Sequence, residues 1–241
     1  MKLYNCATES KNSSGANHAV DAAAQNNSLA SVPASLPSVR VKELCERDRR
    51  RILMHFLGLP DSDRLLRFGI ILPDESVTRY VQRLDFSRDK IFGVLDENFQ
   101  LVGVGHLAFA ARDAWPAITG ATQKARLAEF GVSVSQNARG LGAGTKLFER
   151  AAIHCRNADI DTLTMHCLAT NQVMIRIAHK AGMDIRRDYG DADAYLKLQP
   201  ADTASVLREA VDEQIATFDY NIKANIRAAN KWLNALSAFK N

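Results

Sequence analysis

Three glycines in a short turn are the clearest chemical signal in this sequence. Gly140, Gly142 and Gly144 lie between residues 129–134, where apolar and polar residues alternate, and residues 145–153, which are good helix formers. The alternation predicts a strand, so the order is strand, glycine-rich turn and helix. Glycines leave the backbone open to a ligand, and the first turn of a helix presents unpaired N–H groups at the positive end of its dipole. This arrangement predicts a site for a phosphate or pyrophosphate group.

Two common phosphate-binding motifs do not fit the turn. A P-loop requires Ser or Thr directly after its lysine, but Leu147 follows Lys146. A dinucleotide fingerprint requires a third glycine where this chain has Thr145 or Leu147. Both motifs are therefore excluded by the residues present.

A third phosphate-binding pattern, Arg/Gln-x-x-Gly-x-Gly/Ala, is satisfied by Arg139, Gly142 and Gly144. It resembles the acetyl-CoA pyrophosphate loop of the GNAT N-acetyltransferase superfamily. Farther along the chain, Asn171 and residues 181–183 resemble the family's segment in which an asparagine starts the helix beside the CoA arm. The resemblance implies an acetyl-CoA-dependent enzyme.

The resemblance extends upstream of the turn. Arg67-Phe68 together with AEFGVSV at 128–134 resembles the acetyltransferase domain of bacterial protein-lysine acetyltransferases. The elements expected from residue patterns follow the order of the GNAT fold. They are helices at 41–57 and 73–84, strands at 91–95 and 100–110, a loop at 111–124, a strand, turn and helix within 127–156, a strand at 162–168, a helix at 171–180 and a last strand at 195–198. We expect an α+β protein with a central mixed, mostly antiparallel sheet flanked by helices.

The chain divides into three parts by composition. Residues 1–38 are rich in Ser, Ala and Asn and are expected to form a disordered tail, because they cannot bury enough apolar surface to offset the entropy of ordering. Residues 39–200 are expected to form the acetyltransferase domain. Residues 201–241 are expected to form a C-terminal amphipathic helical extension.

Net charge and cysteine usage limit the class of protein. The net charge is +4, which suits an anionic cofactor but is too small to indicate nucleic acid. The basic run at 45–51, CERDRRR, is interpreted as a solvated helix face, with an acidic partner or nucleic acid as the alternatives. The four cysteines form no CxxC pair, and there is neither an apolar signal segment nor an apolar run long enough to cross a membrane. A soluble cytoplasmic protein is expected.

The resemblance implies acetyl-CoA as cosubstrate, no metal, and a specific set of contacts. The implied cofactor-binding residues are Val132, Ser133, Val134, Arg139, Gly140, Leu141, Gly142, Ala143, Gly144, Thr145 and Asn171. The backbone of 132–134 would pair with the pantetheine arm, and an N–H near Val132 would face the thioester oxygen. Asn171 would contact CoA, cap its own helix, or do both.

Acetyl transfer to an amine also requires proton transfer. Glu129, at the start of the central strand, is the candidate base, and the alternative is a strand-edge glutamate paired with Arg126 or Lys124. It is expected on the face opposite Val132 unless a bulge intervenes. Many family members carry a tyrosine as acid seven residues after the asparagine, but that position is Ala178 here. The acid is therefore unassigned.

Histidines outside this region give weaker signals. His154-Cys155 and His166-Cys167 suggest zinc, but on a strand adjacent side chains point to opposite faces, so a pair contributes at most one ligand. Packing is the preferred interpretation for both pairs. His106 either lines an acceptor cleft or is a satisfied core histidine.

Two classes of function remain. The leading one is an N-acetyltransferase that transfers acetyl directly to an amine, either a protein lysine or a small-molecule amine. The alternative is a CoA-binding regulatory or interaction module with little or no catalysis, which the missing tyrosine at 178 favours and the intact glycine turn disfavours.

The C-terminal extension has its own pattern. Residues 202–239 contain no Gly or Pro, and apolar residues recur at helical spacing. They are Val211, Ile215, Phe218, Ile222, Ile226, Ala229, Leu233 and Leu236. A continuous helix would be ~55 Å long. We expect this stripe to pair with a second copy of the chain, and the alternative is docking on the domain.

Overall fold

The computed structural model describes residues 39–110 and 126–238. The tail expected at 1–38 and the loop expected at 111–124 lie outside the described residues. In the part of the chain that is described, no helix is both long and apolar enough to cross a membrane.

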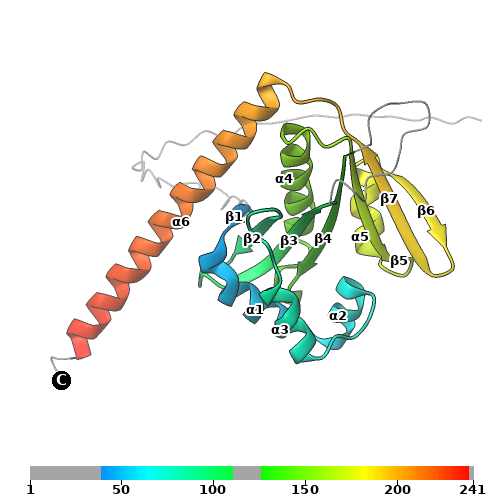
Figure 1. Ribbon diagram of the computed structural model, residues 1–241. Coiled ribbons are helices and arrows are strands. Elements are labelled where there is room, and N and C mark those ends of the chain that lie inside the picture. Colours follow the sequence, from blue (N-terminus) through cyan, green and yellow to red (C-terminus); the bar gives the residue numbers. More distant parts are fainter. Residues whose placement is uncertain (1–38, 111–125, 239–241) are drawn as a thin grey trace, which may run out of the picture. The chain divides into compact units, whose positions relative to one another are not determined.

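A seven-stranded mixed sheet forms the centre of the protein (Figure 1). Its strands are β1 (Lys42–Leu44), β2 (Lys90–Leu95), β3 (Leu101–Phe109), β4 (Leu127–Val134), β5 (Thr162–Leu168), β6 (Asp184–Asp188) and β7 (Asp191–Lys197). The spatial order is β1-β2-β3-β4-β5-β7-β6. The pairing of β4 with β5 is parallel and every other pairing is antiparallel, so the expected mostly antiparallel sheet is confirmed.

Helices cover the two faces of the sheet and enclose two apolar cores. They are α1 (Arg49–Leu57), α2 (Asp61–Phe68) and α3 (Asp74–Gln82) on one side, and α4 (Ala143–Asn157) and α5 (Gln172–Lys180) on the other. Because β4 alternates, Phe130 packs against Phe148 of α4, whereas Ser133 contacts His55 of α1. Short 3-10 turns, η1 (Glu46–Asp48) and η3 (Gln136–Ala138), precede α1 and the glycine turn.

The predicted element order was wrong in three places. Helix α2 was not predicted, because its eight residues are too few for a clear helical period. Residues 41–57 do not form one helix, because 42–44 pair with β2 as strand β1 and α1 begins only at Arg49. The Asp48 carboxylate accepts a hydrogen bond from the Cys45 N–H (3.2 Å), which fixes the turn between strand and helix. Strand β6 was not predicted, and β7 begins four residues earlier than expected, at Asp191. β6 is an exposed edge strand in which only Ile185 is half-buried, so it shows no apolar alternation. The first half of β7 does alternate, but its inward residues are the small Ala192 and Ala194, which give a weak strand signal.

A single long helix, α6 (Thr203–Ala238), follows the sheet and passes α4 and β1 (orange to red in Figure 1). It contacts α4 through polar groups. Arg150, only 5% exposed, forms ion pairs with Glu209 (2.6 Å) and Glu213 (3.1 Å), and His154 bonds to Glu209 (2.7 Å). The polar side of α6 therefore docks on the domain.

The apolar stripe of α6 lies on the opposite side and is exposed. Phe218 is 68% exposed and Ile226 is 55% exposed, and Val211, Ile215 and Ile222 each retain more than a third of their accessible surface. Docking of the stripe on the domain, the alternative interpretation, does not occur among the described residues. A polar face packs within the chain while the apolar face is left uncovered.

Candidate functional site

Strands β4 and β5 separate at the centre of the sheet. They pair at Leu127↔Thr162, Ala128↔Leu163 and Glu129↔Thr164, and the described residues beyond these form no further pairs. The backbone hydrogen bonds between β3 and β4 involve the odd-numbered residues of β4. At one end the Ser135 N–H donates to the Val102 carbonyl (2.8 Å), and at the other end the Leu127 carbonyl accepts from the Ala110 N–H (3.1 Å). By the alternation of antiparallel pairing, Val132 and Val134 direct their N–H and C=O groups toward the gap. This is an open backbone edge within a sheet.

The glycine turn lies at the end of this edge. Gly140 and Gly142 have φ of +77° and +84°, in the left-handed region that side chains other than glycine rarely adopt. Gly142 is the N-cap of α4, so the first-turn N–H groups of that helix face the same space. At Gly144 a Cβ would lie 3.1 Å from Ile177 Cδ1, so this glycine allows α4 to pack closely against α5.

A cavity of about 370 Å³ opens between β4, the glycine turn, α5 and α2. Ten of the predicted cofactor-binding residues line it: Val132, Ser133, Val134, Arg139, Gly140, Gly142, Ala143, Gly144, Thr145 and Asn171. Leu141 does not line it and is 58% exposed. An open strand edge, left-handed glycines and a helix N-terminus in one cavity fit a phosphate-bearing ligand with an extended arm, which is the chemistry of CoA.

Asn171 caps its own helix, one of the two roles expected of it, and it also lines the cavity. Its Oδ1 accepts from Met174 N–H (3.2 Å), which caps α5, and its Nδ2 donates to the Leu66 carbonyl (3.3 Å) of α2. The side chain is buried, and it lines the cavity. The cap therefore also sets the distance between α2 and α5 across the cavity.

Two cations on α5 and one carboxylate on α2 were missed by the sequence analysis. Arg176 and Lys180, one helical turn apart, line the cavity and have no ion-pair partner among the described residues. Arg139 is instead held by Asp63 (2.5 Å) and donates from Nε to the Val134 carbonyl (3.2 Å). The i, i+4 spacing of the two α5 cations after Asn171 was the signal that could have identified them.

A second cavity of about 230 Å³ adjoins the first, and Leu66, Arg67, Val132 and Met174 line both. Glu129 lines it. The β3–β4 register runs without a bulge, so Glu129 lies on the face opposite Val132, as expected.

The alternative interpretation of Glu129 as a structural ion pair finds no support in the described residues. Arg126 pairs with Asp159 (3.8 Å) and Asp161 (3.6 Å) instead, and Lys124 lies outside the described residues. Glu129 is exposed in the cleft and has no ion-pair partner among the residues that the structure describes.

His166 lies on the same face of the sheet and lines the second cavity. Its Nδ1 bonds to Asp193 Oδ1 (2.8 Å), and this hydrogen bond raises the pKa of His166 above its usual value. Glu129 lines the same cavity, and its negative charge also raises the pKa of His166. The sequence alone favours packing for His166, because its contact with Asp193 depends on the β5–β7 register. The neighbouring Cys167 is a buried thiol whose pKa is raised by burial.

Arg67 projects from α2 over the wall between the two cavities. Its guanidinium lies near the rings of Phe68 (5.0 Å from Cζ to centroid), Tyr80 (5.7 Å) and Phe56 (5.9 Å) and donates to the Tyr80 hydroxyl (3.0 Å). Its Nε is buried without a hydrogen-bond partner, and no carboxylate in the described residues pairs with it. A positive charge without an anionic partner therefore faces the cleft.

A chain of hydrogen bonds supports Arg67 from behind. The Tyr80 hydroxyl bonds to His106 Nδ1 (2.9 Å), and His106 Nε2 bonds to Asp89 Oδ2 (3.0 Å). Burial raises the pKa of Tyr80 and lowers the pKa of His106. His106 lines neither cavity, so of its two interpretations the satisfied core histidine is the correct one.

The histidine–cysteine pairs do not form a metal site in the described ranges. His154 is engaged by Glu209 and His166 by Asp193. No group of three His, Cys, Asp or Glu residues with metal-binding geometry occurs in the part of the chain that is described.

Solved structures share this fold. The GNAT domain of S. lividans PAT has a TM-score of 0.54 at 21% identity, covering 66% of this chain and 90% of that chain. An acetyltransferase of the GNAT family from Streptococcus pneumoniae has a TM-score of 0.51 at 11% identity, covering 66% and 99%. An N-acetyltransferase from Staphylococcus aureus Mu50 has a TM-score of 0.50 at 17% identity, covering 67% and 99%. At these identities the likeness shows the fold.

Sequence comparison identifies the family. No curated protein sequence matches this chain. A profile described as the Acetyltransferase (GNAT) family matches residues 60–183, from the beginning of α2 to just beyond α5. This range is more than half of the chain and contains the open strand edge, the glycine turn and every lining residue of the two cavities except Leu59. The chain therefore belongs to the GNAT acetyltransferase family, whose members transfer acyl groups from acetyl-CoA.

Proposed function

We propose that this protein transfers the acetyl group of acetyl-CoA directly to an amine acceptor. The observation that carries the proposal is the open backbone edge of Val132 and Val134, which lies between the glycine turn and a second cavity containing Glu129. Such an edge can hold an extended ligand by main-chain hydrogen bonds. The acceptor then reaches the same point from the second cavity.

Cofactor binding follows from the residues of the first cavity. The glycine turn and the first turn of α4 would bind the pyrophosphate through N–H groups, and Arg176 and Lys180 would add positive charge. The edge of Val132 and Val134 would hold the pantetheine arm. Acetyl-CoA supplies an activated acetyl group as a thioester.

Two donors are available for the negative charge that develops on the thioester oxygen. The Val132 N–H points into the gap between β4 and β5, and the Arg67 guanidinium faces the same region. Fixed donors in a water-poor site are each worth ~3–4 kcal/mol of transition-state stabilisation where one has been removed by mutation. Arg67 is well suited because its aromatic surroundings hold it in one orientation.

Proton transfer is assigned to Glu129 and His166. The acceptor nitrogen forms a bond to the acetyl carbon and loses a proton to Glu129, directly or through water, while the carbon–sulfur bond breaks. The departing thiolate takes a proton from His166, whose raised pKa keeps more of it protonated near neutral pH. His166 thus fills the role that a tyrosine at position 178 would have had, since Ala178 is buried.

The second candidate function is a CoA-binding module with little or no catalysis. It rests on the absence of a tyrosine at position 178. It predicts CoA binding without consumption of the thioester by any amine.

The experiment that tests the proposal measures CoA binding by calorimetry and thioester consumption against a panel of lysine-containing peptides, polyamines and amino acids. The Gly142→Asp variant should lose CoA binding, because it places a carboxylate beside the pyrophosphate and a side chain at φ +84°. Gly190→Asp is the matched control, since Gly190 also has a positive φ (+110°) and open space but lies outside both cavities. Absence of CoA binding by the parent chain would refute the proposal. Binding without turnover on any acceptor would establish the second candidate.

We further propose that α6 mediates homodimerisation through its apolar stripe. The stripe is exposed while the opposite side of the helix docks on α4. The apolar residues of the stripe recur at nearly coiled-coil spacing, and a second copy of α6 presents the same apolar face, so it can cover the stripe.

A further inference from the structure

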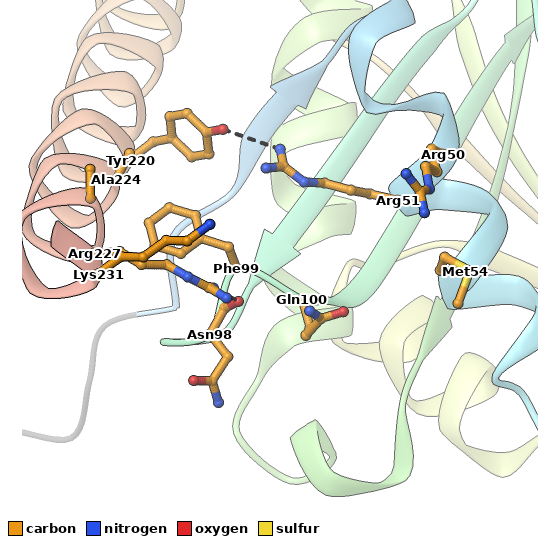
Figure 2. Close-up of a pocket in the computed structure, with 11 residues that line it drawn as sticks. Arg50, Arg51, Met54, Asn98, Phe99, Gln100, Tyr220, Ala224, Arg227 and Lys231 are labelled. Atoms are coloured by element: carbon orange, nitrogen blue, oxygen red, sulfur yellow. Dashed lines mark hydrogen bonds between the residues drawn. The ribbon is translucent and has the colours of Figure 1, made fainter. Parts of the chain in front are cut away.

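A groove of about 450 Å³ lies between α1, the turn joining β2 to β3, and the second half of α6. Figure 2 shows Arg50 and Met54 on α1 at one side, Arg227 and Lys231 on α6 at the other, and Phe99 of the turn between them. The groove shares no lining residue with the two cavities of the proposed active site. It is a separate feature of the molecule.

The groove concentrates positive charge without compensating it. Arg50, Arg51, Arg227 and Lys231 line it, and none of its lining residues is Asp or Glu. Arg51 pairs with Asp48 (2.9 Å) and donates to the Tyr220 hydroxyl (3.1 Å). Arg50 and Lys231 have no ion-pair partner among the described residues, and Arg227 donates only to the Asn98 carbonyl. The proximity of these cations raises the electrostatic free energy of the folded chain through mutual repulsion, and an anion bound in the groove would reduce that repulsion.

The floor of the groove is built around a strained residue. Phe99 has φ +60°, a conformation uncommon for a bulky side chain and costly when it occurs. Asp96 holds the turn by accepting from the N–H groups of Asn98 and Gln100, both at 2.8 Å. The strain places the Phe99 ring against Tyr220 (5.5 Å) and beneath Arg227 (5.7 Å), so the turn is fixed to α6.

We propose that this groove binds a short oligophosphate, either an inorganic chain or the phosphates of a nucleotide. Guanidinium groups from α1 and α6 match phosphate oxygens in geometry, and Lys231 adds a mobile donor. The volume exceeds what one carboxylate or one phosphate fills, and the size is that of a small-molecule site. The cations surround one groove rather than following a track along the surface, which favours a small ligand over a nucleic-acid strand. The basic run at 45–51 thus contributes Arg50 and Arg51 to a site assembled from distant parts of the chain.

The test is a calorimetric titration of the full chain with sodium tripolyphosphate. The chain carries Gly142→Asp, which removes the glycine turn as a competing phosphate site. Addition of Arg50→Ala and Lys231→Ala should weaken binding at least tenfold. Arg47→Ala with Arg208→Ala is the matched control, because it removes the same charge from exposed positions near α1 and on α6 outside the groove, and it should change affinity less than twofold. Thermal melts of all variants establish that each is folded.

Three results would overturn the proposal. The first is no binding of tripolyphosphate by the chain with an intact groove. The second is an equal loss of affinity in the groove pair and the control pair, which would mean non-specific attraction. The third is tighter binding of a ten-nucleotide single-stranded RNA than of tripolyphosphate, with this RNA binding lost in the variant that carries Arg50→Ala and Lys231→Ala. That result would mean that the groove binds a nucleic-acid strand. If the groove pair melts early, Lys231→Gln alone replaces it, with an expected loss of several-fold. CoA binding by the parent chain is measured separately, so failure here and failure of the proposed acetyl transfer are distinguishable.

Discussion

The guanidinium of Arg67 lies directly against the backbone of Gly131. A Cβ at position 131 would be 2.8 Å from Cζ of Arg67 and 2.9 Å from each of its terminal nitrogens. The glycine thus creates the space that the cation occupies, on the face of β4 that also carries Glu129. This close approach brings α2 onto the strand at the point where β4 and β5 separate.

Removal of the Arg67 charge should slow acetyl transfer. We expect Arg67→Gln to lower kcat by about a hundredfold or more, because a fixed donor near the developing oxyanion is lost. Arg67→Lys should recover only part of that loss, since the planar contact with Phe68 and Tyr80 is not reproduced. Steady-state kinetics with saturating acetyl-CoA checks both variants.

Gly131→Ala should act through the same cation. The new methyl group displaces the guanidinium, so kcat should fall although Arg67 is intact. In the double variant with Arg67→Gln, the loss should be no greater than with Arg67→Gln alone, since both changes remove one interaction. Losses that simply add would show that the two residues act independently.

The pH dependence of turnover should report His166. Asp193 raises the pKa of His166, and its protonated form is the proposed proton donor, so kcat should fall as pH rises through that raised pKa. Asp193→Asn should move this alkaline fall to lower pH, and His166→Gln should abolish it while lowering kcat. An alkaline limb that is unchanged in both variants would exclude His166 as the acid.

Glu129→Gln should lower kcat and leave CoA affinity nearly intact, which separates the base from the cofactor site.

The sequence predicts those parts of the fold whose signals are local. The alternation in β4, the three glycines and the cap at Asn171 lie within short segments, and the structure places them together at one cavity. Strand β1 was hidden because its three residues precede a helical pattern without a break. Strand β6 is mostly exposed, so it carries no apolar alternation to detect.

Contacts that depend on tertiary packing could not be predicted. The pairing of Arg67 with Gly131 requires α2 to dock on β4, and the His166–Asp193 bond requires the β5–β7 register. Arg50 and Lys231 meet only because the polar side of α6 docks on the domain. Residue spacing along the chain contains none of these relationships, since each joins elements far apart in sequence.

His55 should make the protein less stable in acid. Its Nδ1–H donates to the Leu101 carbonyl (2.9 Å) and its Nε2 accepts from Ser133 Oγ (2.8 Å), a neutral arrangement. Burial lowers the pKa of His55 from 6.5 to about 4. The unfolded chain binds a proton below pH 6.5 and the folded chain does not until about pH 4, so stability is full above pH 6.5 and is lost as pH falls through this window. At pH 4.5 the loss should be about 2.5 kcal/mol relative to pH 7.5.

Urea denaturation at the two pH values measures this effect. His55→Gln should be less stable than the parent at pH 7.5, because it cannot reproduce both hydrogen bonds, yet it should lose less stability on acidification. Burial also lowers the pKa of His106, so His106 contributes to the loss of stability on acidification in both the parent and His55→Gln. The difference in that loss between the two proteins therefore reports His55. Equal losses in parent and variant would contradict the assignment.

The apolar stripe of α6 should hold two copies of the chain together. Burial of a large apolar side chain contributes ~1.5 kcal/mol or more, so leaving Ile215, Phe218, Ile222 and Ile226 in water would forgo a substantial stabilisation. Ile222→Asp with Ile226→Asp should convert a dimer into a monomer in light scattering while CoA binding is retained, because the docked side of α6 is unchanged. Asn221→Asp with Asn230→Asp, which adds the same charge at exposed positions beside the stripe, should leave the dimer intact. A parent chain that is monomeric at every concentration would contradict self-association, and the stripe would then require a different partner.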